Sequence, residues 1–420
     1  MRALYSLSIF LFGLSIRIAS LFNPKARLWV KGRKNLFTEL DTKLRKGKGP
    51  VAWFHCASLG EFEQGRPLIE RFRETHPEYR VLLTFFSPSG YEVRKNYPGA
   101  DIISYLPLDT PGKAKRFITL VQPSIVFFVK YEFWLNHLSE IAKKKIPHLL
   151  VAAVFRPEQS FFKSWGGIFR KALQDYSFIF TQEKASLELL RSIGIQQAEE
   201  AGDTRFDRVT EIAAQAKAIP LAAAFAGTEK RVLVAGSSWP QDEELLLPAM
   251  KNHFANGWKL LIAPHELGET HLSSIEQKLA ANGIAADSIL RFSKADKTKA
   301  ASATVLIIDN IGMLSSLYRY GKIAYIGGGF GKSIHNTLEA AVYGIPVIFG
   351  PRFEKFNEAK GLIACRGGFG VHTGKELDET IIRLLSNENE LIAAGKKAGD
   401  YVSANTGATE TVMKKTAEFI

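Results

Sequence analysis

The chain of 420 residues is too long for one hydrophobic core, because single cores stop growing at about 250 to 300 residues, so two domains are the default expectation. Hydrophobic residues make up 46% and charged residues 23%, which excludes a largely disordered protein. The two cysteines, Cys56 and Cys365, exclude a disulfide framework and a cysteine-based zinc site, and they fit a reducing compartment.

The formal net charge of +13 is concentrated near the N-terminus. The first 50 residues hold eleven Lys or Arg and two acidic residues, a net charge of +9. A basic arm beside an apolar segment indicates attraction to an anionic membrane face or to an anionic lipid substrate. Nucleic-acid binding is the alternative, but the arm lacks interleaved aromatic residues and no nucleic-acid motif follows, so we expect no nucleic-acid partner.

The apolar segment runs from Ala3 to Phe22 and is broken by Arg17. As a helix, it is long enough to span roughly one hydrocarbon core. A helix lying in the membrane interface is equally open, because four residues share one stripe: Ser6, Gly13, Arg17 and Ser20. A cleaved signal peptide is a third interpretation, which Arg17 disfavours. The basic excess after the helix predicts a cytoplasmic body by the positive-inside rule.

Apolar runs of strand length alternate with helix-period stretches in both halves, which predicts two α/β domains with parallel sheets. The runs are 51–57, 81–86, 124–129, 148–154 and 178–181, then 231–236, 258–264, 304–309, 322–328 and 345–350. Residues 208–230 are rich in Ala without a strand signal and are the expected linker. The predicted divisions are 1–34 (apolar helix and basic arm), 35–207, 208–230 and 231–420, and the C-terminal helix is a candidate for returning to the first domain.

Open α/β sheets bind ligands beyond the carboxyl ends of their strands, so the loops there are the candidate sites. In Tyr325–Pro351, we expect a strand to end at Gly327 and a helix to begin near 333–336, which leaves backbone amides for a phosphate. Asn336 and Glu339 would share one helix face, with Glu339 placed for ribose hydroxyls and Asn336 for the phosphate. A glycine-rich turn needed for packing alone is the alternative.

Two further loops of the second half carry candidate contacts. "IAPHELGETH" presents Pro264 and His265 after a strand, and the spacing of His265 to His271 does not match a zinc motif, so we expect no metal there. "DNIGMLSSLY" presents Ile311–Met313, which could hold a base through backbone groups.

In the first half, Glu132 and Arg205 follow strands. Glu132 lies among aromatic residues, which biases its pKa upward and makes it a functional candidate, although a helix N-terminal acid would look the same. Arg205 could clamp a phosphate or carboxylate, and a surface ion pair with Asp203 or Asp207 is the alternative.

Glu61 follows a buried strand and a small-residue turn. "SLGE" from Ser58 to Glu61 fits a capping box, in which Glu61 bonds back to the amide of Ser58. A catalytic base would instead keep a carboxylate oxygen facing the substrate. His55 and Cys56 are strand neighbours and point to opposite faces, so burial of Cys56 is expected rather than catalysis.

Taken together, "HCASLGEF", "KYEFWLN", "AGDTRFD", "APHE", "IGM" and "HNTLEAAVYGIPVIFGP" resemble the Kdo (3-deoxy-D-manno-octulosonic acid) transferases, which are glycosyltransferases of the GT-B fold. The resemblance covers nearly the whole chain. It implies two Rossmann-like domains with parallel sheets facing a central cleft, plus a membrane-associated N-terminal helix. Such enzymes transfer Kdo from CMP-Kdo to the lipid A precursor, lipid IVA, at the cytoplasmic face of the Gram-negative inner membrane during lipopolysaccharide synthesis.

The resemblance also implies roles for individual residues. Glu61 matches the general base, and Glu132 and Arg205 match positions that stabilise the transition state of an inverting displacement. The CMP-binding positions are Pro264, His265, Ile311, Gly312, Met313, Asn336, Thr337, Leu338 and Glu339. No metal and no cofactor besides the donor CMP-Kdo are expected.

The chain departs from the family pattern at two motifs. The usual "GNLKFD" is "GDTRFD" here, so Arg205 replaces a Lys, and the usual "GGHNPLEPA" is "KSIHNTLEAA", which removes glycines from the phosphate loop. Two other functions stay open: a GT-B enzyme that uses a UDP-sugar, as transferase or epimerase, and a non-catalytic membrane-anchored module that binds nucleotide or lipid. The sequence does not determine the number of Kdo units, the oligomeric state, or whether residues 3–22 span the membrane or lie on it.

Overall fold

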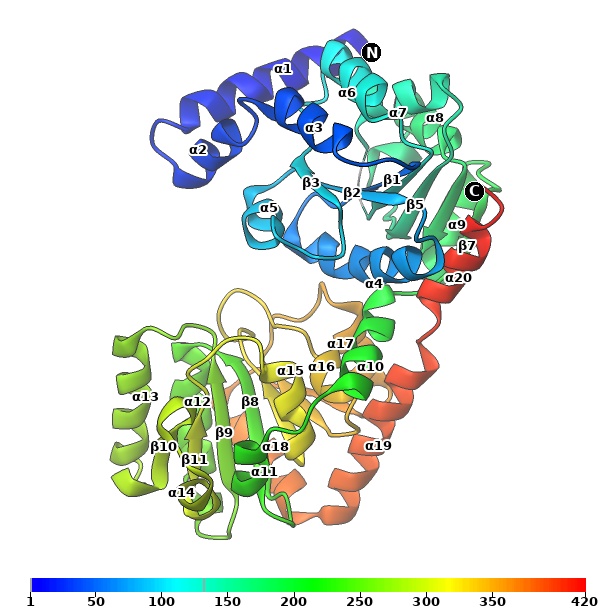
Figure 1. Cartoon of the computed structure of the whole chain (residues 1–420). Coiled ribbons are helices and arrows are strands. Elements are labelled where there is room, and N and C mark those ends of the chain that lie inside the picture. Colours follow the sequence, from blue (N-terminus) through cyan, green and yellow to red (C-terminus); the bar gives the residue numbers. More distant parts are fainter. Residues whose placement is uncertain (1, 131–132) are drawn as a thin grey trace. The chain divides into compact units, whose positions relative to one another are not determined.

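The computed structural model describes residues 2–130 and 133–420, which form two compact units (Figure 1). The first unit comprises Met1–Arg208 and Thr406–Ile420, and the second comprises Val209–Asn405. The first boundary lies inside helix α10 (Thr204–Gln215), at the start of the predicted linker. The rest of that segment contains α11 (Pro220–Ala226), which packs on α14 (Lys297–Ser302) within the second unit.

The first unit is built on a seven-stranded parallel sheet in the order β3-β2-β1-β4-β5-β6-β7. Its strands are β1 (Val51–His55), β2 (Arg80–Phe85), β3 (Ile102–Tyr105), β4 (Ile125–Val129), β5 (His148–Ala153), β6 (Phe178–Thr181) and β7 (Ala198–Glu200). Successive residues of β1 point to opposite faces, so Trp53 and Phe54 enter two different apolar clusters. Both faces of the sheet are therefore covered, as a buried parallel sheet requires.

Helices supply the two covering layers of this unit. They are α3 (Leu36–Arg45), α4 (Leu59–Thr75), α5 (Pro88–Arg94), α6 (Pro111–Val121), α7 (Leu135–Lys143), α8 (Gly167–Asp175), α9 (Lys184–Ser192) and α20 (Ala408–Thr416), with a 3₁₀ turn η1 (Ser160–Phe162). Helices α4 and α20 cover the face that contains Phe54, and α3 and α6–α9 cover the face that contains Trp53.

The C-terminal helix is tied to this unit by one carboxylate. Asp207 accepts hydrogen bonds from the backbone N–H groups of Gly407 and Thr409 and from the Thr409 hydroxyl, at 2.6 to 2.7 Å. Helix α20 also packs against α4. The segment that begins at Thr406 thus completes the layer that starts with α4.

The second unit has a parallel sheet of the same size, in the order β10-β11-β9-β8-β12-β13-β14. Its strands are β8 (Val232–Ser238), β9 (Lys259–Pro264), β10 (Ile289–Arg291), β11 (Val305–Ile307), β12 (Ile323–Ile326), β13 (Val347–Phe349) and β14 (Gly368–Gly370). Its other helices are α12 (Pro240–Phe254), α13 (Glu269–Ala281), α15 (Leu314–Leu317), α16 (Leu338–Ala341), α17 (Asn357–Ala364), α18 (Gly374–Ser386) and α19 (Glu388–Ala404), with 3₁₀ turns η2 (Ala286–Ser288), η3 (Phe292–Lys294) and η4 (Tyr318–Tyr320).

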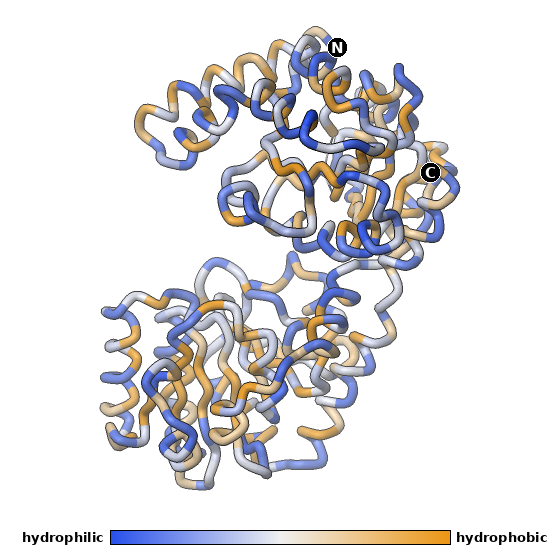
Figure 2. Tube along the Cα trace, in the orientation of Figure 1, coloured by the Kyte–Doolittle hydropathy of each residue, from blue (hydrophilic) through white to orange (hydrophobic). Residues whose placement is uncertain are grey.

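The predicted fold class, two α/β units with parallel sheets and an apolar N-terminal helix, is confirmed. All ten predicted apolar runs contain strands, and Figure 2 shows them as hydrophobic stretches inside each unit. The sequence missed β3, β7, β10 and β14, which are the two edge strands of each sheet.

Helix α1 (Arg2–Ala19) is long and apolar enough to cross a membrane, by length and composition. It lies beside α2 (Pro24–Lys31), as Figure 1 shows. One stripe of α1, which contains Tyr5 and Gly13, packs on the first unit. The Tyr5 hydroxyl donates to Asp109 at 2.6 Å, and a Cβ on Gly13 would lie 2.5 Å from Leu108. Six apolar side chains of α1 are each at least 45% exposed: Leu4, Leu7, Phe10, Leu11, Leu14 and Ile18.

Candidate active site

Each sheet has one point at which the strand order reverses, and ligand sites of open α/β sheets form there. In the first unit this point lies between β1 and β4, and in the second unit between β8 and β12. Glu61 follows β1, and Trp239 and His335 follow β8 and β12. Glu132 follows β4 in sequence but lies outside the described residues.

Glu61 lies in the first turn of α4 and takes part in a capping box. The Ser58 backbone N–H donates to Glu61 Oε2 at 3.0 Å, and the Glu61 N–H donates to Ser58 Oγ at 3.4 Å. Glu61 therefore caps α4, as one of the two interpretations of its sequence expected, and this hydrogen bond occupies one of its carboxylate oxygens. The space beside the turn is open, since a Cβ on Gly60 would meet no atom within 4 Å. The role of Glu61 as a base stays a prediction.

A buried polar network lies under this turn. Trp134 Nε1 donates to His55 Nε2 at 3.2 Å; because an indole nitrogen only donates, His55 is protonated on Nδ1 and donates to Thr84 Oγ1 at 2.8 Å. Trp53 Nε1 also donates to Thr84 Oγ1, at 2.7 Å. Cys56 is fully buried, as predicted. The network fixes the end of β1 and the start of the 134–137 segment.

Arg205 forms an ion pair with Asp203, which is one of the two partners expected if Arg205 has no catalytic role. Asp207 instead binds the C-terminal segment. The Nε and Nη2 atoms of Arg205 contact the Asp203 carboxylate at 2.9 and 2.6 Å, and the pair is mostly shielded from solvent. The preceding Thr204 donates its hydroxyl to the Gln64 carbonyl of α4 at 2.5 Å. The starts of α4 and α10 are therefore held together, and with them the loops that carry Glu61 and Arg205.

In the second unit, the glycine loop after β12 is held by a buried carboxylate. Asp242 accepts from the Gly328 N–H at 2.7 Å, the Trp239 N–H at 2.9 Å and the Tyr325 hydroxyl at 2.8 Å. Burial is the main cause that raises the pKa of Tyr325 far above its usual value, and the charge of Asp242 and this hydrogen bond add to it. Gly328 has a φ of +91°, which glycine adopts without strain. Sequence analysis missed Asp242.

The helix predicted to begin near 333–336 is present but begins two residues later. Helix α16 begins at Leu338 and has one turn. The amides of the preceding residues bond elsewhere: Ile334 N–H donates to the Arg352 carbonyl at 3.4 Å and His335 N–H to the Gly327 carbonyl at 3.2 Å. One turn carries little macrodipole, so any phosphate here would depend on individual donors of the loop.

Asn336 and Glu339 share one face, as predicted. Asn336 Nδ2 donates to Glu339 Oε1 at 3.2 Å, while its Oδ1 accepts from the Leu338 N–H at 3.1 Å. Thr337 and Leu338 are fully buried, and the Thr337 hydroxyl has no hydrogen-bond partner among the described residues. Asn336 and Glu339 thus present the polar groups of this segment, and Leu338 anchors it in the core.

An aromatic cluster joins three of the loops. The His265 ring stacks on Trp239, with centroids 4.5 Å apart, and lies 4.7 Å from the His335 ring. Trp239 Nε1 donates to His335 Nε2 at 3.1 Å. Burial is the main cause that lowers the pKa of His335, and the neighbouring His265 adds to it. The lowered pKa favours the neutral His335 ring, whose Nε2 can accept the hydrogen bond from Trp239. Pro264 is buried, whereas His265 is exposed.

The remaining predicted segment lies one strand away. Ile311–Met313 follows β11, the neighbour of β9. Ile311 is 90% exposed, and Gly312 has a φ of +92° with open space around its Cα. The loops after β11, β9, β8 and β12 therefore follow one another along one edge of the sheet, and the predicted CMP-binding positions lie in three of these loops or in the elements next to them. Within residues 2–130 and 133–420, no three His, Cys, Asp or Glu side chains gather to hold a metal ion.

The first unit also contains an amphiphilic cavity of about 970 Å³ between α1, α2, α3 and the start of α6. Its apolar wall includes Phe10, Leu14, Phe37 and Leu108. Among the described residues that line it, six are basic and none is acidic; the basic ones are Arg17, Lys31, Arg33, Lys34, Lys113 and Arg116.

Arg33 is the most buried cation of this cavity. Its guanidinium lies 3.9 Å from the centroid of the Trp29 ring and 4.6 Å from that of Tyr105, and it donates to the carbonyls of Leu106 and Phe86 at 2.9 and 2.7 Å. Burial lowers the pKa of Arg33 to about 9, so the group is charged at neutral pH. Burial, followed by the charges of Arg17 and Arg33, also lowers the pKa of Lys113. Because neighbouring cations repel one another, binding of an anion in this cavity is electrostatically favourable.

Comparisons with known proteins agree with this architecture. The family profile described as 3-Deoxy-D-manno-octulosonic-acid transferase (kdotransferase) matches residues 31–208. The 3-deoxy-D-manno-octulosonic acid transferase of Aquifex aeolicus is 30% identical over 83% of this chain and 89% of its own length, and that of Rickettsia felis is 26% identical over 88% and 79%.

Among solved structures, the fold is similar to that of UDP-GlcNAc 2-epimerase from Neisseria meningitidis bound to UDP-GlcNAc. The TM-score is 0.61, with 14% identity over 88% of this chain and all of that one. At this identity the likeness shows the GT-B-like fold and does not favour a UDP-sugar. The length and identity of the match to the Aquifex aeolicus enzyme show that the chain belongs to the 3-deoxy-D-manno-octulosonic acid (Kdo) transferase family.

Proposed function

We propose that the chain is an inverting, metal-independent glycosyltransferase that transfers Kdo from CMP-Kdo to the lipid A precursor lipid IVA. The observation that carries the acceptor is the cavity between α1, α2, α3 and α6, which combines an apolar wall with six basic side chains. An acylated sugar that carries phosphates needs both features: apolar surface for its chains and cations for its phosphates. Neither a water-soluble sugar nor an uncharged lipid needs both.

The donor is assigned to the second unit. The Trp239–His265 stack offers an aromatic face to the cytosine base, and the exposed 311–313 loop offers backbone groups to its edge. Glu339 would accept from the ribose hydroxyls, and Asn336 with the glycine loop would bind the phosphate. CMP-Kdo has a single phosphate, which backbone amides and side-chain donors can neutralise without a metal.

The three residues proposed for the chemistry, Glu61, Glu132 and Arg205, belong to the first unit. Glu61 takes the proton from the primary hydroxyl of the acceptor, and that oxygen forms a bond to the anomeric carbon of Kdo as the bond to the phosphate breaks. CMP leaves with the electron pair of that bond. Glu132 and Arg205 act on the oxocarbenium-like transition state, with Arg205 balancing the donor carboxylate or phosphate after exchange of its contact with Asp203.

The enzyme is placed at the cytoplasmic face of the inner membrane. The exposed apolar side chains of α1 enter the interface, and the basic residues around it attract anionic headgroups. The stripe that contains Tyr5 and Gly13 is already used for packing on the first unit. This packing favours a helix that lies in the interface over one that spans the bilayer.

Charge removal in the acceptor cavity tests the assignment. We expect Lys113→Gln/Arg116→Gln to raise the KM for lipid IVA by about tenfold or more and to leave the KM for CMP-Kdo unchanged, because both cations lie in the lipid cavity. The matched control is Lys115→Gln/Lys171→Gln, which removes two exposed charges outside the cavity. An equal rise for the control, or a rise in the CMP-Kdo KM alone, contradicts the acceptor site.

A further inference from the structure

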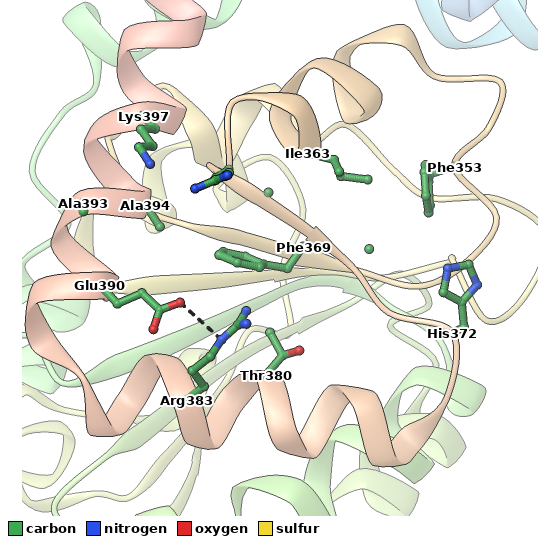
Figure 3. Close-up of a pocket in the computed structure, with 13 residues that line it drawn as sticks. Phe353, Ile363, Phe369, His372, Thr380, Arg383, Glu390, Ala393, Ala394 and Lys397 are labelled. Carbon is green, nitrogen blue, oxygen red and sulfur yellow. Dashed lines mark ion pairs between the residues drawn. The ribbon is translucent and has the colours of Figure 1, made fainter.

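The second unit has a groove of about 710 Å³ along the outer edge of its sheet, at β14 (Figure 3). It lies between β14, α18 and α19, and none of the predicted CMP-binding residues lines it. Figure 3 shows Phe369 projecting from β14 into this space, with Lys397 on one side and the pair Arg383–Glu390 on the other. The Arg383 guanidinium lies 5.2 Å from the centroid of the Phe369 ring.

Among the described residues, the backbone of β14 has hydrogen-bonding groups that its neighbour β13 does not use. Its ladder to β13 uses the Gly367 carbonyl, which accepts from Val347 at 3.1 Å, and the Val371 N–H, which donates to Phe349 at 2.9 Å. Because parallel strands alternate between their two neighbours, the N–H and C=O groups of Gly368 and Gly370 point away from β13. Both glycines line the groove.

Helix α19 lies against the residue just before β14, and along the strand itself Gly368 is buried while Phe369 and Gly370 are half-buried. A Cβ on Gly367 would lie 2.6 Å from the Ala398 backbone nitrogen, so α19 touches the strand there. The groove runs on from this contact past Gly370 to His372. An edge strand that lines a groove with alternating donors and acceptors matches another peptide backbone, whereas a phosphate group could use the donors alone.

The charge of the groove is positive. Arg366, Arg383 and Lys397 line it, against one acid, Glu390, which pairs with Arg383 at 3.3 Å. In the described part of the chain, the side chains of Arg366 and Lys397 form no ion pair or hydrogen bond. An incoming segment with carboxylates on one face would neutralise both.

We propose that the outer edge of β14 is a docking site for an extended acidic peptide segment of a partner protein, which adds as a strand beside Gly368–Gly370. Its alternate acidic side chains pair with Arg366 and Lys397, and its apolar side chains, which point to the other face, pack on Phe369. Main-chain hydrogen bonds contribute affinity, and the two cations select the sequence.

Fluorescence anisotropy with the full chain tests the proposal. The probe is a short labelled peptide that alternates glutamate with valine, and we expect saturable binding. Arg366→Glu/Lys397→Glu should weaken binding by about tenfold or more, because it reverses the two unpaired charges. Lys251→Glu/Lys396→Glu is the matched control, with the same change of net charge on exposed positions outside the groove. An unchanged thermal unfolding midpoint shows that the variants fold.

A second probe separates strand addition from simple charge attraction. N-methylation of alternate peptide residues removes N–H donors without changing charge, and we expect it to abolish binding in the register that faces β14. Three results overturn the proposal: no binding of the parent peptide, equal weakening by the control variant, and binding that survives N-methylation in both registers. Loss of anionic-vesicle binding in Arg366→Glu/Lys397→Glu, with unchanged peptide binding, would instead make the groove a membrane contact.

Discussion

At the scale of single residues, Glu61 has one carboxylate with two proposed tasks. The capping box satisfies the Ser58 amide and fixes the first turn of α4, so the group is already oriented before substrate binds. A base must offer an oxygen to the acceptor hydroxyl in the reactive complex, where hydrogen bonds differ from those of the free enzyme. Glu61 can therefore cap α4 in the free enzyme and act as a base in the reactive complex. Substitutions can measure these two roles separately, as stability and as turnover.

Glu61→Gln keeps a side chain that can complete a capping box, so we expect its free energy of unfolding to change by less than about 0.5 kcal/mol. Its turnover number should fall by roughly 10² to 10⁴, because an amide cannot accept the proton. Ser58→Ala is the matched control, which should cost about 1 kcal/mol of stability and spare most of the activity. Full activity of Glu61→Gln with unchanged CMP-Kdo binding would remove Glu61 from the mechanism.

The cluster of Trp239, His265 and His335 predicts a pH effect. The pKa of His335 is lowered in the folded chain from 6.5, so the unfolded chain binds this proton at higher pH. The stability contributed by neutral His335 is therefore complete above about pH 6.5 and is lost as pH falls toward the folded pKa. Between about pH 7 and pH 5, the wild-type chain should lose more free energy of unfolding than His335→Gln, as followed by urea denaturation. Parallel pH profiles of the two proteins would exclude this contribution.

At the scale of elements, interior strands were predictable and edge strands were not. Strands such as β4 and β8 are apolar on both faces, which gives a clear signal in the sequence. The missed strands have three or four residues; β7 reads AEE and β14 reads GFG. Such segments are strands because a neighbour pairs with them, and pairing between distant segments leaves no local pattern.

The prediction at the scale of elements concerns the binding of helix α1 to a membrane. Leu7 and Leu11 are about half exposed and lie off the stripe that packs on the first unit, so Leu7→Ser/Leu11→Ser should leave the unfolding midpoint unchanged. Sedimentation with anionic vesicles should fall by about tenfold or more, because apolar area drives insertion into the interface. Ile382→Ser/Ile392→Ser, at exposed apolar positions of the second unit, should bind vesicles like the wild type. Equal vesicle binding by all three proteins would contradict docking through α1.

At the scale of the whole molecule, the sequence predicted two α/β units and the loops that carry the candidate site. It could not predict Trp239, whose partner His335 lies 96 positions away, or the anchoring of the C-terminal segment by Asp207, about 200 positions away. It placed the start of α16 too early, because the amides before Leu338 bond to other loops. In each case the deciding contact joins segments that no local pattern relates.

We propose that this member of the Kdo transferase family moves Kdo from CMP-Kdo onto lipid IVA. Mass analysis of the lipid after incubation of the full chain with lipid IVA and excess CMP-Kdo tests it most directly. We predict a lipid heavier by one or more whole Kdo units, with release of CMP, and the number of units follows from the same spectrum. Unmodified lipid with CMP-Kdo, or a sugar transferred from a UDP-sugar in its place, would contradict the claim.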